Sequence, residues 1–460
     1  MMNRRAFLAS AAAAAGSACV GPRLPRPNVL VLMPDQWRAM GLGAMGNPDV
    51  RTPNMDALAA NGALLRNLTA NCPVCCPARG TLLTGRFGHE HGVDVNDAPL
   101  PDSEVTIAEI ARDNGYRTAF AGKWHLEGGK RLPGYVRPER RQGFDFWAAN
   151  ICTHNYWNMQ YFRDSPEPIQ IEGYSATAFT DEIIDFIGSD AETPFLAYVQ
   201  WGPPHNPYVA PPAYMNMYDP NLLKMRENWN GPVQLRAGRA LGSRQDIAGY
   251  YAAITFLDDE VGRIVDALKA TGQFENTVIL ITSDHGDMLG SQDTVLKRKP
   301  WAESLQVPGI VHYPAAVPAG QQLTLPASHV DVVPTLLGLA GLPAAETVSG
   351  ADLSRHLLAE EHGGRPDSPA PESVYAQSYT PTERGEFPAW RGVRTERHTY
   401  ARSQDQAWLL YDNVADPFQL RNLAGKPEHA AVQAELDELT MDWFARTEDD
   451  WRERADLPYR

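Results

Sequence analysis

The chain has 460 residues, of which 43% are hydrophobic and 21% are charged. These values are typical of a globular protein with one large core and a smaller second domain, and they exclude a disordered or fibrous chain. The net charge of -15 disfavours nucleic acid or an anionic membrane surface as the main partner, so an anionic substrate would need a locally positive pocket.

Residues 1–24 differ from the rest of the chain. Arg4 and Arg5 precede an Ala-rich apolar run that ends at Cys19, and this pattern resembles a bacterial twin-arginine export signal. An Ala-rich terminus without a targeting role is the alternative. Cys19 is a possible lipid anchor, although Gly16 stands where a large aliphatic residue is usual. We expect an exported, periplasmic or extracellular protein, with no transmembrane segment elsewhere.

Four apolar runs predict buried strands, and residues between them predict helices. The runs cover residues 28–33, 117–121, 194–199 and 277–282. A helix is expected over residues 53–61, with Pro53 in its first turn and Gly62 as its stop. This alternation predicts an α/β fold in which helices flank a large, mostly parallel mixed sheet.

Polar residues follow each predicted strand. They are Asp35, Lys123, His125, His205, Asp284 and His285. One such residue is more often a cap or a turn residue, but six of them at equivalent strand ends predict a binding site at one edge of the sheet. Lys123 and His125 are two residues apart, so extended backbone would turn both side chains to the same side.

Three of the five cysteines lie within residues 72–76. The segment 72–86 predicts a loop that enters a short helix, and Cys75 would lie just ahead of the helix N-terminus, where anions are favoured. A structural zinc site would need a second ligand pair, and only Cys152 remains for it. A redox pair of Cys72 and Cys75, or simple buried cysteines, are the other interpretations.

Two motifs then carry a family resemblance. Cys75-x-Pro77-x-Arg79, followed by Thr84-Gly85-Arg86, resembles the signature of type I sulfatases in the alkaline phosphatase superfamily. In that family the cysteine is oxidised to formylglycine (3-oxoalanine). Residues 115–118 and 122–126 are similar to the second signature, and the resemblance extends along almost the whole chain after the N-terminal segment. It implies a sulfuric ester hydrolase.

The resemblance also implies a metal site. It places a divalent cation, usually calcium, on Asp35, Asp284 and His285, with Gln36 as a further oxygen ligand and Cys75 completing the site. Oxygen ligands suit calcium, and the imidazole would also accept manganese. Many sulfatases have Asp and Asn where this chain has Gln36 and His285. Choline-sulfatase-like and phosphonate-monoester-hydrolase-like relatives share the Gln and His.

Catalytic roles follow from the same motif match. Arg79 and Lys123 would hold the formylglycine oxygens, and His125 would be the base that releases sulfate. Lys297 and His205 would contact the sulfate and help to protonate the leaving oxygen, with Lys299 as the competing lysine.

Two segments on expected loops are candidates for substrate contact. The aromatic residues at 154–157 and 208–218 would form a sugar-binding wall or pack locally. His154 is the candidate substrate-binding residue among them because it lies in a polar run.

A Pro- and Gly-rich segment near residue 365 predicts a domain boundary. Residues 25–365 would form the catalytic α/β domain, and residues 366–460 a small α+β domain with an antiparallel sheet and a helix. Short strands are expected over 373–376 and within 390–400, and a helix over 428–444.

The expected substrate is a sulfated carbohydrate or a related small ester, and the expected partner is a formylglycine-generating maturation enzyme. A phosphonate monoester or phosphodiester hydrolase is the alternative enzyme, because the same site would accept either tetrahedral anion. A non-catalytic binding protein, with Cys75 left unmodified, is the alternative outside catalysis.

Overall fold

A computed structural model describes residues 25–129, 131–235, 238–381 and 387–451. The predicted export signal, including Cys19, lies outside the described residues. Within the described part, no helix is both long and apolar enough to cross a membrane.

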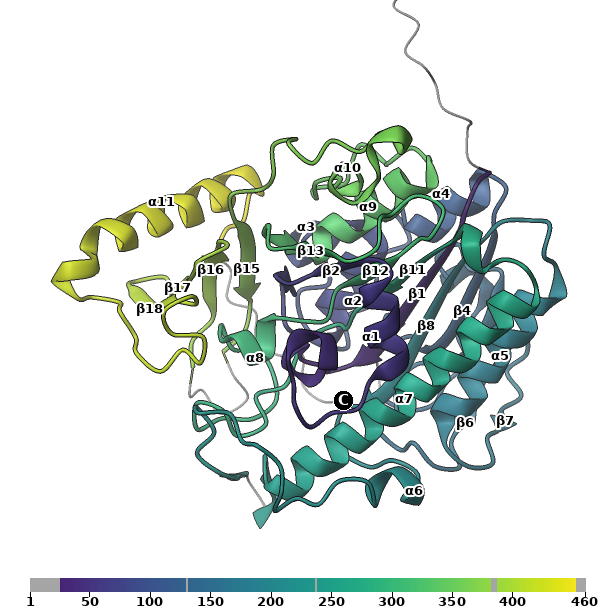
Figure 1. Ribbon diagram of the computed structural model, residues 1–460, viewed down its shortest axis with the longest axis horizontal. Coiled ribbons are helices and arrows are strands. Elements are labelled where there is room, and N and C mark those ends of the chain that lie inside the picture. The colour runs from purple at the N-terminus through teal and green to yellow at the C-terminus, as the bar shows by residue number, and fades with distance from the viewer. Residues whose placement is uncertain (1–24, 130, 236–237, 382–386, 452–460) are drawn as a thin grey trace, which may run out of the picture.

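An eight-stranded sheet forms the centre of the molecule (Figure 1). Its strands, in spatial order, are β13 (Gln321–Leu323), β2 (Ala63–Leu65), β12 (Ile310–His312), β11 (Thr277–Ile281), β1 (Asn28–Asp35), β8 (Phe195–Pro204), β4 (Arg117–Lys123) and β5 (Phe146–Asn150). All neighbours are parallel except β12, which is antiparallel to both β11 and β2. The mostly parallel sheet is therefore confirmed.

Strand β1 shows why these runs are apolar throughout. All eight of its residues are buried, because the strand lies between β11 and β8 and both faces of the sheet are covered. Leu30 and Leu32 pack into one core with α5 (Ser175–Ser189) and α7 (Arg244–Ala270). Val29 and Val31 pack into a second core with α2 (Cys75–Thr84), α4 (Ile107–Asp113) and α9 (His329–Ala340) on the other face (Figure 1).

The predicted helix at residues 53–61 is α1 (Pro53–Ala60), and Asn61 is its C-terminal cap. Gly62 follows because a Cβ atom there would lie 2.4 Å from the carbonyl oxygen of Val311. The sequence does not show this contact. The remaining α-helices of the main body are α3 (Gly88–His91), α6 (Pro212–Met215), α8 (Ala302–Leu305) and α10 (Ser354–Leu357).

Three two-stranded sheets complete the main body. They pair β3 (Leu68–Thr69) with β14 (Ala327–Ser328), β6 (Gln160–Tyr161) with β7 (Ile169–Gln170), and β9 (Val233–Gln234) with β10 (Ala240–Leu241).

A four-stranded antiparallel sheet and α11 (Ala430–Arg446) form the smaller C-terminal part (Figure 1). Its strands are β15 (Val374–Ser378), β16 (Trp390–Arg394), β17 (His398–Arg402) and β18 (Ala407–Asp412). The predicted sheet and helix are confirmed, and the region 390–400 contains parts of two strands. Trp390 packs with Met288, Trp301 and Leu305 of the main body, so the C-terminal sheet shares a core cluster with α8 and the segment before it.

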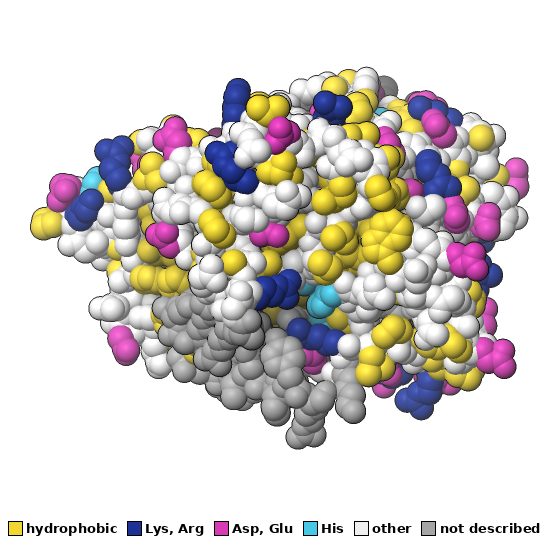
Figure 2. Space-filling view, turned by 90° about the horizontal axis from the view of Figure 1, so that it is seen from below, with side chains coloured by type: hydrophobic (Ala, Val, Ile, Leu, Met, Phe, Trp, Pro, Cys, Tyr) yellow, Lys and Arg dark blue, Asp and Glu magenta, His cyan; other side chains and the backbone are white. Residues whose placement is uncertain are grey.

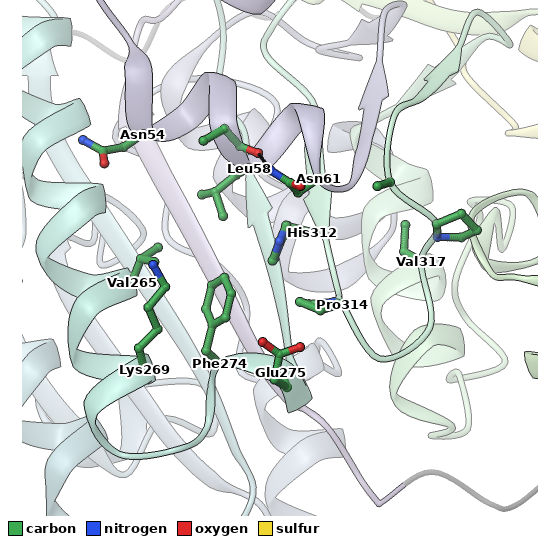
Figure 3. Close-up of a pocket in the computed structure, with 13 residues that line it drawn as sticks. Asn54, Leu58, Asn61, Val265, Lys269, Phe274, Glu275, His312, Pro314 and Val317 are labelled. Atoms are coloured by element: carbon green, nitrogen blue, oxygen red, sulfur yellow. Dashed lines mark hydrogen bonds between the residues drawn. The ribbon is translucent and has the colours of Figure 1, made fainter.

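A cavity of about 520 Å³ opens at the edge of the main sheet opposite the predicted site. Figure 3 shows His312 between Phe274 and Asn61 in its wall. His312 pairs with Ile279 near the start of β11, whereas the predicted site residues follow strand ends. None of these site residues lines the cavity.

Figure 2 shows the face of the molecule that points downward in Figure 1. Basic and histidine side chains gather there beside a hollow in the surface. The acidic chain thus presents local positive charge on this face.

Candidate active site

Cys75 is the first residue of α2, and its side chain is buried at 2% exposure. The sequence placed it just ahead of the helix, so the helix begins slightly earlier than predicted. Val74 is the N-cap residue, and Gly85 ends the helix in the left-handed conformation at φ 68°. The thiol therefore lies at the helix end whose N–H groups and dipole favour negative charge.

Asp35, Asp284 and His285 converge on Cys75. One ligand atom from each of the four residues lies within 4.8 Å of the other three. Cys75 Sγ is 3.2 Å from His285 Nε2. His285 Nδ1 donates to the Gly286 carbonyl at 3.0 Å, and this bond leaves the Nε2 lone pair for the cluster.

The donor set fits a divalent cation. Two buried carboxylates and an imidazole nitrogen meet where a cation could bind all of them, and Asp35 Oδ1 is buried without a hydrogen-bond partner. A buried carboxylate oxygen without a donor is costly, and a cation would remove that cost.

Arg79 and Lys123 neutralise this acidic cluster. The Nη2 atom of Arg79 is 3.0 Å from Asp35 and 2.9 Å from Asp284, and Lys123 Nζ is 2.5 Å from the same oxygen of Asp35. The other end of the guanidinium donates to the Lys123 carbonyl and to the Gln200 side chain. Both cations thus lie inside the predicted site, in contact with its carboxylates.

Burial and charge act in opposite directions on the groups of the cluster. Burial would raise the pKa of Asp35, but Lys123, His205 and Arg79 hold that pKa well below its usual range. Burial and the charge of Asp35 raise the pKa of Asp284. Burial would also raise the pKa of the Cys75 thiol, but Lys297 above all lowers it well below its usual range. The site therefore favours an anion at position 75.

Gln36 is held on two sides. Its backbone is left-handed at φ 66°, and its N–H donates to Asp284 at 2.9 Å. Its Oε1 accepts from Lys297 Nζ at 2.7 Å, and its Nε2 donates to Asp287 at 2.6 Å. The predicted oxygen ligand therefore binds a lysine here.

A second group of predicted site residues, Lys297, His205 and His154, lies next to Gln36. Lys297 Nζ is 2.8 Å from His205 Nε2, and His205 Nδ1 donates to the Asn206 carbonyl at 2.7 Å. Burial, then Lys297, lowers the pKa of His205 well below its usual range, and because Nδ1 donates to a carbonyl, the His205 Nε2 atom accepts from Lys297 Nζ. The His154 ring stacks on His205 at 4.2 Å between centroids. Lys299 donates instead to the Val295 carbonyl at 2.7 Å.

His125 does not follow the extended backbone expected for residues 123–125. Strand β4 ends at Lys123, and His125 is left-handed at φ 58°. Its Nε2 is 3.1 Å from Asp97 Oδ1, and its carbonyl accepts from Cys76 Sγ at 2.9 Å. Lys123 and His125 thus contact different carboxylates. Burial would lower the pKa of His125, but Cys152, Cys76 and Asp97 raise it well above its usual range.

Comparison of the sequence with protein families identifies the family of this chain. A family profile described as Sulfatase matches residues 27–342, more than half of the chain. The chain belongs to the sulfatase family. A second profile, described as N-sulphoglucosamine sulphohydrolase, C-terminal, matches residues 290–444. The enzyme is a sulfatase of the alkaline phosphatase superfamily.

Curated relatives agree with this assignment. The sulfatase is 37% identical over 438 residues to an ulvan-active sulfatase of Formosa agariphila, covering 93% of this chain and 83% of the relative. It is 28% identical over 466 residues to an endo-4-O-sulfatase of Bacteroides thetaiotaomicron, covering 88% of this chain and 89% of the relative.

Solved structures have the same fold. One, from work on glycosaminoglycan metabolism by Bacteroides thetaiotaomicron, gives a TM-score of 0.82 at 26% identity and covers 93% of the sulfatase and 98% of that chain. A phosphonate monoester hydrolase of Agrobacterium radiobacter gives 0.75 at 25% identity and covers 92% and 96%.

The other cysteines of the described part, Cys72, Cys76 and Cys152, are buried and free, as Cys75 is. Burial raises the pKa of Cys72, which therefore stays a thiol. The neighbours of Cys75 are two carboxylates and an imidazole instead of the cysteine ligands of a zinc ribbon. This geometry favours neither the redox pair nor the structural zinc site.

The predicted aromatic wall is mostly local packing. Tyr156 is buried, and its hydroxyl donates to the carbonyls of Gly202 and His205, so it supports the end of β8. Tyr208 is buried and donates to Asp287 at 2.7 Å. Trp157 lies against Tyr174 at 5.1 Å between ring centroids. His154 is the member of this group whose side chain contacts the side chain of another predicted site residue, through its stacking on the His205 ring.

Sequence reasoning missed two carboxylates beside the site, Asp97 and Asp287. Asp287 lies two residues after His285, and this spacing was its only signal. Asp97 has no such signal, because a loop contact 28 residues away in sequence brings it to His125.

Proposed function

We propose that this sulfatase removes sulfate from a sulfated carbohydrate through a formylglycine nucleophile made from Cys75. The observation that carries the proposal is the buried thiol at the N-terminus of α2, surrounded by the ligand atoms of Asp35, Asp284 and His285. The hydrated aldehyde of formylglycine would supply one hydroxyl that attacks sulfur and displaces the alcohol of the ester, and a second hydroxyl whose deprotonation re-forms the aldehyde and expels sulfate without attack by water.

We assign calcium, or another divalent cation such as manganese, to Asp35, Asp284, His285 and residue 75. Gln36 Oε1 accepts from Lys297 with one lone pair, and its second lone pair would make it a further oxygen ligand. The cation would supply positive charge to the sulfate oxygens.

The protein's own residues would perform the remaining steps. Arg79 and Lys123 hold negative charge at position 75, beside the carboxylates that they already neutralise. His125, with Nε2 on Asp97, keeps Nδ1 for proton exchange, since that atom is buried without a partner. Lys297 carries the proton for the leaving oxygen, and His205 and His154 orient its ammonium group.

The 37% identical relative is named for activity on ulvan, so a sulfated polysaccharide of this kind is the first substrate to assay. Residues 1–24 would direct export, with Cys19 as the possible lipid anchor, and a formylglycine-generating enzyme would act on Cys75 before or during it. Residues 25–365 would form the catalytic domain and residues 366–460 the C-terminal domain.

The proposal is tested by peptide mass spectrometry across Cys75 after coexpression with a maturation enzyme. We expect the aldehyde or its hydrate, and an unmodified thiol in an active preparation would overturn the proposal. Turnover of an aryl sulfate and an aryl phosphonate monoester is then compared. A clear preference for the phosphonate would replace sulfate hydrolysis by the alternative that the phosphonate monoester hydrolase fold suggests.

Chelation tests the cation separately from the chemistry. A chelator should abolish turnover and lower the melting temperature, and calcium should restore both. A cation at 100 times its dissociation constant stabilises the folded state by about 2.7 kcal/mol. An unchanged melting temperature and unchanged activity after exhaustive chelation would exclude the metal site.

A further inference from the structure

Asp287 is a fully buried carboxylate to which the proposed function gives no role. Its Oδ2 accepts from Gln36 Nε2 at 2.6 Å and from the Tyr208 hydroxyl at 2.7 Å. Its Oδ1 accepts from the backbone N–H groups of Leu289 at 3.1 Å and Leu296 at 3.0 Å. Four donors therefore satisfy a buried charge whose burial would otherwise be costly.

Gln36 lies between this carboxylate and Lys297. A carboxylate can only accept hydrogen bonds and an ammonium can only donate them, whereas an amide has one end of each kind. Asp287 therefore requires Nε2 on its side, and this leaves Oε1 for Lys297 Nζ at 2.7 Å. The direction of the Gln36 amide is set by the charge of Asp287.

Asp287 also holds the loop that carries Lys297. Leu289 and Leu296 have left-handed backbones, at φ 46° and φ 64°, and Asp287 Oδ1 accepts from both of their amides. Tyr208, its fourth donor, follows His205 by three residues at the end of β8. One carboxylate thus connects the chain segments that present Gln36, His205 and Lys297.

We propose that Asp287 is a positioning residue: it fixes the direction of the Gln36 amide and thereby holds the Lys297 ammonium against His205 Nε2. The proposal rests on the role of Lys297 given above.

The substitution Asp287→Asn should reverse this direction. The backbone amides of Leu289 and Leu296 still need an acceptor, so the new side-chain oxygen stays with them and the new NH2 group faces Gln36. The Gln36 amide then turns and presents its own NH2 group to Lys297. We expect kcat to fall about 30-fold with KM changed less, the effect of leaving a buried donor unpaired.

A second substitution at position 36 separates positioning from mere structural support. Gln36→Glu alone places two carboxylates face to face and should also lower kcat. In Gln36→Glu combined with Asp287→Asn, the NH2 group at 287 donates to the carboxylate at 36, whose second oxygen still accepts from Lys297. The kcat of the double variant should therefore be about tenfold higher than that of Gln36→Glu alone, and its melting temperature should also be higher.

Tyr208→Phe is the matched control. It removes a donor from the same oxygen of Asp287 without touching Gln36, and its kcat should stay within about threefold of wild type. A kcat loss in Tyr208→Phe as large as that in Asp287→Asn would overturn the positioning role.

The decisive comparison is between Gln36→Glu and the double variant, so it does not need Asp287→Asn to fold. A double variant that is no better than Gln36→Glu in kcat and melting temperature, or that fails to fold when Gln36→Glu folds, overturns the proposal. Every variant is assayed on whichever aryl ester the wild type turns over. If the wild type prefers the phosphonate, the proposed function is wrong. If the wild type hydrolyses the sulfate but Asp287→Asn does not rescue Gln36→Glu on it, only this inference is wrong.

Discussion

At the scale of single residues, the chemistry of the site depends on which ring nitrogen of each histidine is already hydrogen-bonded to a neighbouring group. His285 and His205 both use Nδ1 on a neighbouring backbone carbonyl, so their Nε2 atoms face the site. His125 has the opposite arrangement, with Nε2 on Asp97. Hydrogen bonds to groups beside the site thus decide where each imidazole can bind a cation or a proton.

Lys297 should be far more important for turnover than Lys299. Lys297 Nζ is held by Gln36 and His205 inside the site, whereas Lys299 Nζ donates to the Val295 carbonyl. We expect Lys297→Ala to lower kcat by about 100-fold or more, the range for loss of a general acid. Lys299→Gln, which can still donate to that carbonyl, should remain within about threefold. Steady-state kinetics on one aryl ester distinguishes them, and equal losses would contradict the assignment.

Most of the residues that the sequence predicted lie at strand ends or in the two signatures. Asp35, Lys123, Asp284 and His285 could be found because a parallel sheet brings its carboxyl ends together. Asp97 and Asp287 could not be assigned, since their roles depend on which loop atoms reach them in the folded chain. The sequence analysis preferred Lys297 and kept Lys299 as the competing lysine; in the structure the residues on either side of Lys297, Leu296 and Arg298, have left-handed backbones.

At the scale of elements, long buried strands were predictable and short ones were not. β1, β4, β8 and β11 have continuous apolar runs, and all four are in the structure. β2, β12 and β13 have three residues each, too few for a periodic pattern, and they form the other edge of the sheet only through pairing with distant segments.

Replacing Gly80 with alanine should destabilise helix α2, although alanine has a higher helix propensity than glycine. Ala would favour an exposed helix by about 1 kcal/mol over Gly. A Cβ at Gly80, however, would lie 2.6 Å from Cε1 of His91, whose ring is held by Thr81 and Val93. We expect Gly80→Ala to lower the free energy of unfolding by about 1–3 kcal/mol.

The control for this substitution is Gly188→Ala in α5. Gly188 is exposed, and a Cβ there would meet nothing within 4 Å, so this change should be neutral or stabilising. Denaturant unfolding of both variants measures the difference. A stabilised Gly80→Ala protein would show that α3 moves freely away from α2.

His91 in α3 (Gly88–His91) should make stability depend on pH. Burial, helped by Arg86, lowers the pKa of His91 to about 3. The unfolded chain binds a proton below its pKa of about 6.5 while the folded chain does not, so stability falls as pH drops below 6.5. At pH 5 this contribution is about 2 kcal/mol.

Replacing the imidazole should remove that part of the pH dependence. We expect the loss of unfolding free energy between pH 7 and pH 5 to be about 2 kcal/mol smaller in His91→Gln than in wild type. Urea unfolding at the two pH values measures it. Parallel losses in the two proteins would mean that His91 is protonated without unfolding.

At the scale of the whole molecule, the C-terminal sheet supports the segments that carry the predicted site. Trp390 at the start of β16 donates from Nε1 to the carbonyl of Arg298 at 3.0 Å, and the Arg298 N–H donates to Pro73 at 3.1 Å. Arg298 therefore connects the C-terminal sheet to the loop before Cys75, and it is the neighbour of Lys297. The late position of this sheet in the sequence gave no sign of that contact.

Trp390→Ala should consequently affect turnover as well as stability. The lost packing against Met288, Trp301 and Leu305 should cost about 3–5 kcal/mol, and the freed Arg298 should let Lys297 leave His205 and lower kcat. Arg397→Ala, on the exposed turn between β16 and β17, should leave kcat unchanged. Melting temperature and kcat are measured together below the melting range. If Trp390→Ala lost stability but kept full kcat, the C-terminal sheet would stabilise the fold without positioning Lys297.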